Sequence, residues 1–242
     1  MKYREFFETF GASYRMKHTQ FLRTARNSGR LHRLFLAIKH LRYFLLAPPL
    51  GNRLFTVYSD SPLPDNFIHL HPWEGEYLFQ VASQARLGIV EVGRLHGGST
   101  FLLACANSVC PIYSIDNDPV DDTYLKNAVI KHCDRELSGI DLIVGDSQST
   151  QYPHIAGADV IFIDGDHSYE GCKRDLYNWW PILSPGGHML FHDCYQESVL
   201  RCLHEFISTE ECGVVLSPYK SDYYSFSPYG SIAHIQKHPK SS

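Results

Sequence analysis

Two apolar runs in this chain end in carboxylates and imidazoles, which are groups that can bind a divalent cation or move a proton. These residues are Asp164, Asp166, His167, His192 and Asp193. Carboxylate oxygens together with an imidazole suit a hard or borderline cation such as Mg2+. Asp164 and Asp193 are the predicted metal ligands, and His192 is a candidate third. The alternatives are that Asp164 caps the following helix and that His192 is an ordinary buried imidazole.

His167 and Asp166 are both candidates for a general base beside such a cation. An unperturbed imidazole has a pKa of about 6.5, which is close to working pH. Asp166 would need a raised pKa, or an acceptor hydroxyl that the metal has made more acidic. The residue types alone therefore leave both candidates open.

A third apolar run ends in a glycine-rich loop that begins at Glu91 and contains Gly93, Gly97 and Gly98. Its glycines allow a tight turn and a close approach of backbone to a ligand. The loop lacks the Gly-x-Gly-x-x-Gly fingerprint of dinucleotide sites and the Gly-Lys-Ser/Thr of phosphate loops. Glu91 would repel a pyrophosphate but suits a cationic ligand, and S-adenosylmethionine (SAM) carries a sulfonium and an ammonium group. A purely structural turn is the alternative.

Two further acids end the next predicted strands. Asp116 lies about twenty residues after the loop, where an acid can accept hydrogen bonds from a ribose diol. Asp146 ends the following strand, where it would border an adenine and accept from its amino group. Each could instead be a helix N-cap, but a succession of acids at strand ends favours a nucleoside site.

The elements that must position these residues alternate strand and helix along the chain. We expect strands at 88–93, 111–116, 141–146, 159–164, 188–193, 214–217 and 231–236, and a turn at 185–187. We expect helices at 73–86, 98–107, 121–137, 169–183 and 197–210. This order predicts an α/β fold with a doubly wound, mostly parallel, Rossmann-like sheet. Ligands bind beyond the carboxyl ends of such strands, so the motifs should open onto one cleft.

The chain divides into a helical N-terminal extension with a linker at 1–70 and a main domain at 71–242. Residues 1–50 carry ten Lys/Arg and two acids, a net charge of +8, whereas residues 51–242 carry twelve Lys/Arg and twenty-four acids, a net −12. A basic arm suggests an anionic partner such as a membrane surface, a nucleic acid or the acidic body of a neighbouring subunit. A solvated helical face is the alternative.

Residues 30–46 are the most apolar part of this arm. We expect them to form a helix that packs on the domain or on a second subunit, which predicts a homo-oligomer. An interfacial membrane helix is the alternative, and it would give peripheral membrane contact. No nucleic-acid partner is expected.

The cysteines bear on the compartment in which the protein works. There are seven, an odd number, and no Cys-x-x-Cys occurs. We therefore expect neither a disulfide framework nor a zinc knuckle, but a reduced protein of the cytoplasm. No stretch reaches the length of a membrane-spanning helix, and the first residues lack the features of a secretory leader.

Taken together, these motifs resemble class I SAM-dependent methyltransferases. The run Ile163-Asp164-Gly165-Asp166-His167-Ser168-Tyr169-Glu170-Gly171, followed by Leu-Ser-Pro-Gly-Gly and His-Asp, is similar to the metal-dependent sugar O-methyltransferases of macrolide and aminocoumarin pathways. The resemblance covers about 73–236, roughly two-thirds of the chain.

The resemblance implies a seven-stranded sheet whose last strand runs antiparallel, with SAM and Mg2+ as cofactors. The implied metal ligands are Asp164 and Asp193, and Asp166 or His167 is the implied base. Where the family often has a second carboxylate before the second aspartate, this chain has His192. The residues expected at the SAM site are Glu91, Gly93, Gly97, Ser99, Asp116, Asp146 and Asp164.

The expected function is a SAM-dependent O-methyltransferase for a hydroxyl of a small acceptor, with a sugar or a glycosylated metabolite as first choice. A catechol-like phenol is an alternative acceptor, because it also offers adjacent oxygens to a metal. A SAM-binding partner protein without catalysis is an alternative from another class. Substrate contacts are expected from the extension and from loops such as 218–230.

Overall fold

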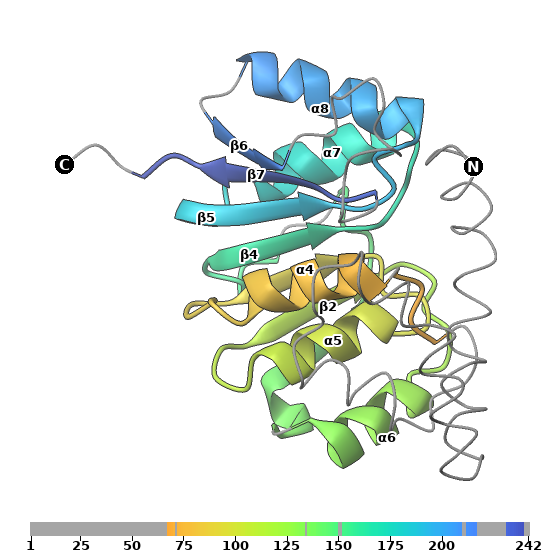
Figure 1. Ribbon diagram of the computed structural model, residues 1–242. Coiled ribbons are helices and arrows are strands. Elements are labelled where there is room, and N and C mark those ends of the chain that lie inside the picture. The colour runs from red at the N-terminus through yellow and green to blue at the C-terminus, as the bar shows by residue number, and fades with distance from the viewer. Residues whose placement is uncertain are drawn as a thin grey trace, which may run out of the picture.

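A single seven-stranded sheet forms the centre of the protein (Figure 1). The computed structural model describes residues 67–70, 72–133, 135–149, 152–209, 212–216 and 231–239. The strands are β1 (Ile89–Val92), β2 (Ile112–Asp116), β3 (Ile140–Val144), β4 (Ala158–Ile163), β5 (Leu183–Phe191), β6 (Cys212–Leu216) and β7 (Ala233–Lys237). The helices are α4 (Pro72–Ala82), α5 (Gly98–Ala106), α6 (Thr123–His132), α7 (Tyr169–Trp179) and α8 (Glu197–Thr209), with a 3-10 turn η1 (Leu137–Gly139). Residues 1–66 of the extension expected at 1–70, and the whole loop at 218–230, lie outside the described residues.

The strand order is β3-β2-β1-β4-β5-β7-β6. Strands β1 to β5 pair in parallel, and β7 is antiparallel to both of its neighbours, β5 and β6. The doubly wound, mostly parallel sheet with an antiparallel last strand is thus confirmed. This is a Rossmann-like fold.

Helices cover both faces of the sheet, which explains why its central strands are apolar on both sides. One core packs α4, α5 and α6 against alternate strand residues such as Ile89 and Phe162. The other packs α7 and α8 against the residues between them, such as Val90 and Ile161. Among the described helices, none is both long and apolar enough to cross a membrane.

The expected turn at 185–187 was wrong, because these residues lie within β5. Gly186 has a φ of 81°, and the pairing register with β4 shifts between Ala158 and Val160, so the strand bends without ending. The expected helix at 169–183 is shorter, ending at Trp179. Pro181 accounts for this end, since proline has no N–H for a further helical hydrogen bond.

One pair of cysteines contradicts the expectation of wholly reduced thiols. Cys105 near the end of α5 and Cys133 after α6 form a disulfide, with their Cα atoms 4.7 Å apart. The other five cysteines lie outside this bridge, and four of them are buried. The odd total was compatible with one bridge, because an odd count excludes only the pairing of every cysteine.

Candidate active site

One cavity of about 470 Å³ lies at the carboxyl ends of the parallel strands, where the topology requires a ligand site. The glycine loop forms one wall, the acids after β2 and β3 form another, and the polar residues after β4 and β5 form a third. Of the residues predicted for the site, those lining the cavity are Gly93, Ser99, Asp116, Asp146, Asp164, Asp166, His167, His192 and Asp193.

The glycine loop has the backbone that its composition predicted. Gly93 and Gly97 have φ angles of 89° and 83°, in the region that favours glycine. Gly97 caps α5 in this conformation and lies against Leu125, behind the cavity wall. Gly98 and Ser99 begin the helix and line the cavity.

Glu91 lies beneath the loop and is not among the cavity-lining residues. Its side chain is fully buried, and its Oε2 accepts hydrogen bonds from the hydroxyls of Thr100 and Ser114, each at 2.5 Å. Burial raises the pKa of this carboxyl, while the hydroxyls of Ser114, Ser99 and Thr100 act in the opposite direction. Glu91 thus ties β1 to α5 and β2, and direct contact with a cofactor stays a prediction.

Arg94 is the loop residue that the sequence reasoning missed. It is 1% exposed, and its guanidinium donates to the carbonyl of Ser114 at 2.5 Å and to Asp122 at 2.9 and 3.3 Å. An arginine in a glycine-rich loop is ordinarily read as a ligand-binding group. Here Arg94 belongs to the cavity lining, but its guanidinium is used to fix the loop to β2 and to the residue before α6.

Asp116 lines the cavity and also holds the loop. Its Oδ2 accepts from the backbone N–H of Arg94 at 2.8 Å and of Leu95 at 2.7 Å, and its Oδ1 accepts from Asp118 N–H at 2.8 Å. A carboxylate has about four lone-pair sites, so one acceptor position is left for a ligand hydroxyl.

Asp146 stands after β3 and lines the same wall. Its carboxylate accepts from the N–H of Gln148 at 2.9 Å and the hydroxyl of Ser149 at 2.7 Å. The hydrogen bonds from Ser149 and Gln148 lower its pKa, so the group is a permanent acceptor at neutral pH. These bonds shape the turn, and two lone-pair positions remain for a ligand.

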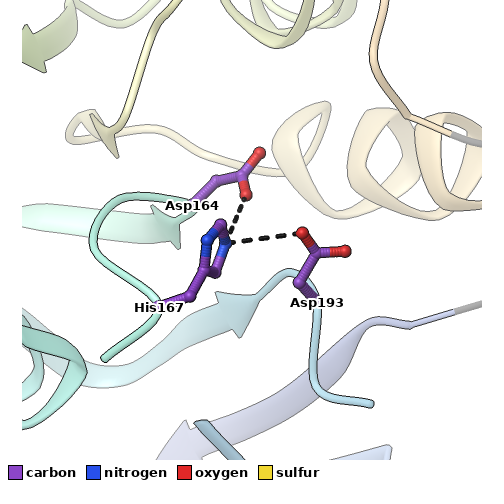
Figure 2. Close-up of side chains that lie close together, drawn as sticks. All are labelled: Asp164, His167 and Asp193. Carbon is purple, nitrogen blue, oxygen red and sulfur yellow. Dashed lines mark ion pairs between the residues drawn. The ribbon is translucent and has the colours of Figure 1, made fainter. Parts of the chain in front are cut away.

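Asp164, His167 and Asp193 converge in the third wall, and their candidate ligand atoms all lie within 4.8 Å of one another. Figure 2 shows the His167 ring directed between the two carboxylates. Its Nε2 lies 3.5 Å from Asp164 Oδ1 and 3.4 Å from Asp193 Oδ2. The sequence predicted the two aspartates together but placed His192 beside them as the candidate third ligand.

The charges of this cluster act on one another. The nearby carboxylate of Asp164 raises the pKa of His167, although partial burial lowers it. Burial alone would raise the pKa of Asp164, but His192 and His167 outweigh it and lower that pKa. Asp166 is separate: its Oδ1 accepts from Ser168 N–H at 2.8 Å, and this bond lowers its pKa.

His192, the candidate third ligand, lines the cavity beside both aspartates, and its Nδ1 lies 3.5 Å from Asp193 Oδ1. It is 3% exposed, and its Nδ1 lies 3.0 Å from Asp164 Oδ1 while its Nε2 lies 3.2 Å from Glu74 Oε2. Both ring nitrogens therefore face carboxylates. Burial would lower its pKa, but Asp164 and Glu74 raise it well above the ordinary value. Glu74 was not foreseen here, because it lies 118 residues away in the sequence.

Asp193 has a strained backbone, with a φ of 53°. A non-glycine residue in this region costs roughly 1–2 kcal/mol, and such strain concentrates at functional sites. Within the described part of the chain, Oδ1 of Asp193 and Nε2 of His167 are buried and make no hydrogen bond. Buried oxygen and nitrogen atoms that make no hydrogen bond and lie beside a second carboxylate are suitable ligands for a divalent cation.

Comparisons with known proteins agree with the fold. Residues 90–194 match the family described as methyltransferase domain. An uncharacterized protein, R132, of Acanthamoeba polyphaga mimivirus is 27% identical over 168 residues, which is 63% of this chain and 73% of that protein.

Solved structures share the architecture at low sequence identity. The Podospora anserina methyltransferase PaMTH1, solved with SAH, has a TM-score of 0.56 and 13% identity, covering 85% of this chain and 95% of that one. CalS11, a TDP-rhamnose 3'-O-methyltransferase of calicheamicin biosynthesis, has a TM-score of 0.52 and 18% identity, covering 76% and 91%. These solved methyltransferases therefore share the fold of this chain, and residues 90–194 match a methyltransferase domain.

Proposed function

We propose that this chain, whose residues 90–194 form a methyltransferase domain, transfers a methyl group from SAM to a hydroxyl oxygen of a small acceptor. The observation that carries the proposal is the convergence of Asp164, His167 and Asp193 in the same cavity as the glycine loop. Such a cluster can deprotonate a hydroxyl beside a bound methyl donor.

The SAM half of the proposal rests on the first two walls of the cavity. Gly93 and Ser99 would border the methionine part of SAM, where the absence of bulky side chains leaves room. Asp116 has one acceptor position left for a ribose hydroxyl, and Asp146 has two for the adenine amino group.

Asp164 and Asp193 would hold the divalent cation, with Mg2+ as the expected ion. Two carboxylates balance its charge, and the unbonded Oδ1 of Asp193 is a ready ligand atom. When bound, such a cation lowers the pKa of an acceptor hydroxyl and fixes its orientation.

His167 is the proposed base, and Asp166 is the weaker candidate. The Ser168 N–H holds the pKa of Asp166 low, whereas Nε2 of His167 faces the cavity without a hydrogen bond among the described residues. Neutral His167 would take the hydroxyl proton on Nε2 as the acceptor oxygen attacks the methyl carbon. The new C–O bond forms as the C–S bond breaks, and S-adenosylhomocysteine leaves.

A sugar or glycosylated metabolite is the proposed acceptor class. Vicinal hydroxyls can share a cation that has only two protein carboxylates, and CalS11, which has the same fold, is a TDP-rhamnose 3'-O-methyltransferase. A screen of glycosides and of catechols on equal terms decides between the two classes of acceptor.

Calorimetric titration with SAM, with and without Mg2+, tests the proposal. We expect micromolar SAM binding by the wild type and by Asp193→Asn, and Mg2+-dependent turnover by the wild type alone. A SAM-binding protein without catalysis would show binding but no methyl transfer with any acceptor. A protein that gives no heat and no thermal shift with SAM would end the proposal.

His167→Gln separates a base from a metal ligand. If His167 is the base, this variant keeps Mn2+ affinity but loses at least a hundredfold in turnover. Loss of both Mn2+ affinity and turnover would identify His167 as a metal ligand. His154→Gln is the control, because His154 is half exposed beside Asp141 and outside the cavity wall; it should change neither quantity.

Assembly and location remain proposals from the sequence. We propose a cytoplasmic homo-oligomer in which the arm at 30–46 packs on the domain or on a second subunit, with peripheral membrane contact as the alternative. Size-exclusion chromatography and liposome flotation, each with and without residues 1–47, test these points. Unchanged liposome binding after the deletion excludes the membrane role.

A further inference from the structure

A closed ring, made of hydrogen bonds and a short stretch of chain, passes through the backbone of Asp193. Glu74 Oε2 contacts the ring of His192, and the chain then runs through Asp193 to Cys194. The N–H of Cys194 donates to the carbonyl of Ser231 at 2.9 Å. Ser231 returns to Glu74 Oε1 through its N–H at 2.7 Å and its hydroxyl at 2.8 Å. Asp193, whose backbone is strained, is therefore a member of this ring.

Glu74 is the member of the ring that joins its two halves. It lies in the first turn of α4 and is 3% exposed, and each of its carboxylate oxygens serves a different half. Oε1 serves Ser231, just before β7, and Oε2 serves His192, just after β5. A favourable interaction with the helix dipole would need only an exposed acid, so burial with two sets of partners calls for another explanation.

The ring also reaches Asp164. His192 contacts Asp164 through Nδ1, the nitrogen opposite the one that faces Glu74. Removing Glu74 would free His192 to rotate, and Asp164 would lose a partner that fixes its Oδ1. Glu74 therefore acts on both carboxylates that line the cavity: on Asp193 through the backbone, and on Asp164 through an imidazole.

We propose that Glu74 is a positioning residue that holds Asp164 and Asp193 in a metal-binding arrangement. The proposal rests on the function proposed above, since it assumes that these carboxylates bind a cation. In this chain the imidazole of His192 links Glu74, which lies outside the cavity lining, to the site.

Glu74→Gln is the sharpest test, because glutamine keeps the size and an oxygen acceptor for Ser231 but presents an amide to His192. Full-length protein is titrated with Mn2+ by electron paramagnetic resonance and with SAM by calorimetry. We expect Mn2+ affinity to fall about tenfold, the scale found when an outer partner of a ligand is lost. SAM affinity should change less than twofold.

Two further variants control for general damage. Glu76→Gln alters another buried acid of α4, which pairs with Gln80 at 2.9 Å, and it should leave Mn2+ affinity unchanged. Ser231→Ala removes a single hydroxyl bond to Glu74 and should weaken Mn2+ binding by a smaller factor. It keeps the test decisive if Glu74→Gln does not fold.

A double-mutant comparison shows whether Glu74 acts through His192. In a His192→Gln background, Glu74→Gln should weaken Mn2+ binding less than twofold further. Wild-type Mn2+ affinity in Glu74→Gln, or an equal loss in both backgrounds, would overturn the proposal while leaving the proposed function intact. A wild type that binds SAM but no Mn2+ would overturn both the metal role and this inference.

Discussion

A β-carbon on Gly93 would lie 2.1 Å from the carbonyl oxygen of Asp164. The two residues follow the neighbouring parallel strands β1 and β4, and Asp164 N–H donates to the carbonyl of Val92 at 2.8 Å. The glycine loop and the first residue of the acidic cluster therefore touch where no side chain fits.

Gly93→Ala should be more damaging than its φ angle alone implies. A left-handed alanine costs roughly 1–2 kcal/mol, and backbone overlap with Asp164 adds to that cost. Gly186→Ala is the matched control, since Gly186 has a φ of 81° but nothing within 4 Å of its added carbon. Urea unfolding should show a loss of about 1 kcal/mol for Gly186→Ala and more than twice that for Gly93→Ala. Equal losses would mean that the contact with Asp164 relaxes without cost.

Arg94→Lys should destabilise the fold, although the charge is kept. Lysine cannot reproduce the forked contacts with Asp122 and the Ser114 carbonyl, so we expect a loss of about 3 kcal/mol. Arg174→Lys, at an exposed arginine, should stay within about 0.5 kcal/mol. The same unfolding assay compares them, and a small loss for Arg94→Lys would show that the buried guanidinium is dispensable.

The sequence predicted the alternation of strands and helices because apolar runs and glycine loops are local signals. It also placed Asp164 and Asp193 together, since adjacent parallel strands bring their carboxyl ends to one edge. It could not tell that His167 and His192 would both contact these two carboxylates. Nor could it place Glu74 beside His192, because no local pattern links α4 to the end of β5.

Burial was the second quantity that residue types did not reveal. Glu91 and Arg94 carry charges that suggest a ligand-binding surface, yet both are covered by neighbouring elements. Their partners, Ser114 and Asp122, come from other segments of the chain. A charged residue in a glycine loop can bind a ligand, or it can be buried and hold the loop in place. Only the packing of the neighbouring elements decides between these two roles.

Asp175 gives the stability a dependence on pH. Burial on α7, with the charges of Asp146 and Asp166 adding to it, raises the pKa of Asp175 from 3.8 to about 6, against the hydrogen bond from Ser147. The folded state therefore disfavours the ionised carboxylate, and its cost appears as pH rises from about 4 to about 6.

Asp175→Asn should remove this dependence. Relative to the wild type, its free energy of unfolding should gain about 2–3 kcal/mol between pH 4 and pH 8. Asp121→Asn is the opposite control: hydrogen bonds from Thr123 lower the Asp121 pKa, so that variant should lose stability relative to the wild type as pH rises. If the difference in free energy of unfolding between Asp175→Asn and the wild type does not change with pH, the carboxylate of Asp175 is more exposed to water than its burial indicates.

The Cys105–Cys133 bridge should be detectable in unfolded protein. Alkylation without reductant should modify five cysteines, and alkylation after reduction should modify all seven, as counted by mass spectrometry. The bridge closes a loop with a sequence separation of 28, so Cys105→Ser with Cys133→Ser should cost about 3 kcal/mol. Cys212→Ser is the control at a cysteine outside the bridge. Seven modified cysteines without reductant would exclude the bridge.

The insertion of β7 between β5 and β6 has a consequence for how the chain is made. During synthesis β5 and β6 emerge before β7, and neither pairs with the other in the finished sheet. Ser231, which precedes β7, also reaches Glu74 only at that late step. A nascent chain that stops before β7 therefore exposes an unpaired edge on β5, a surface open to aggregation and to chaperones, and its Glu74 lacks the bonds from Ser231.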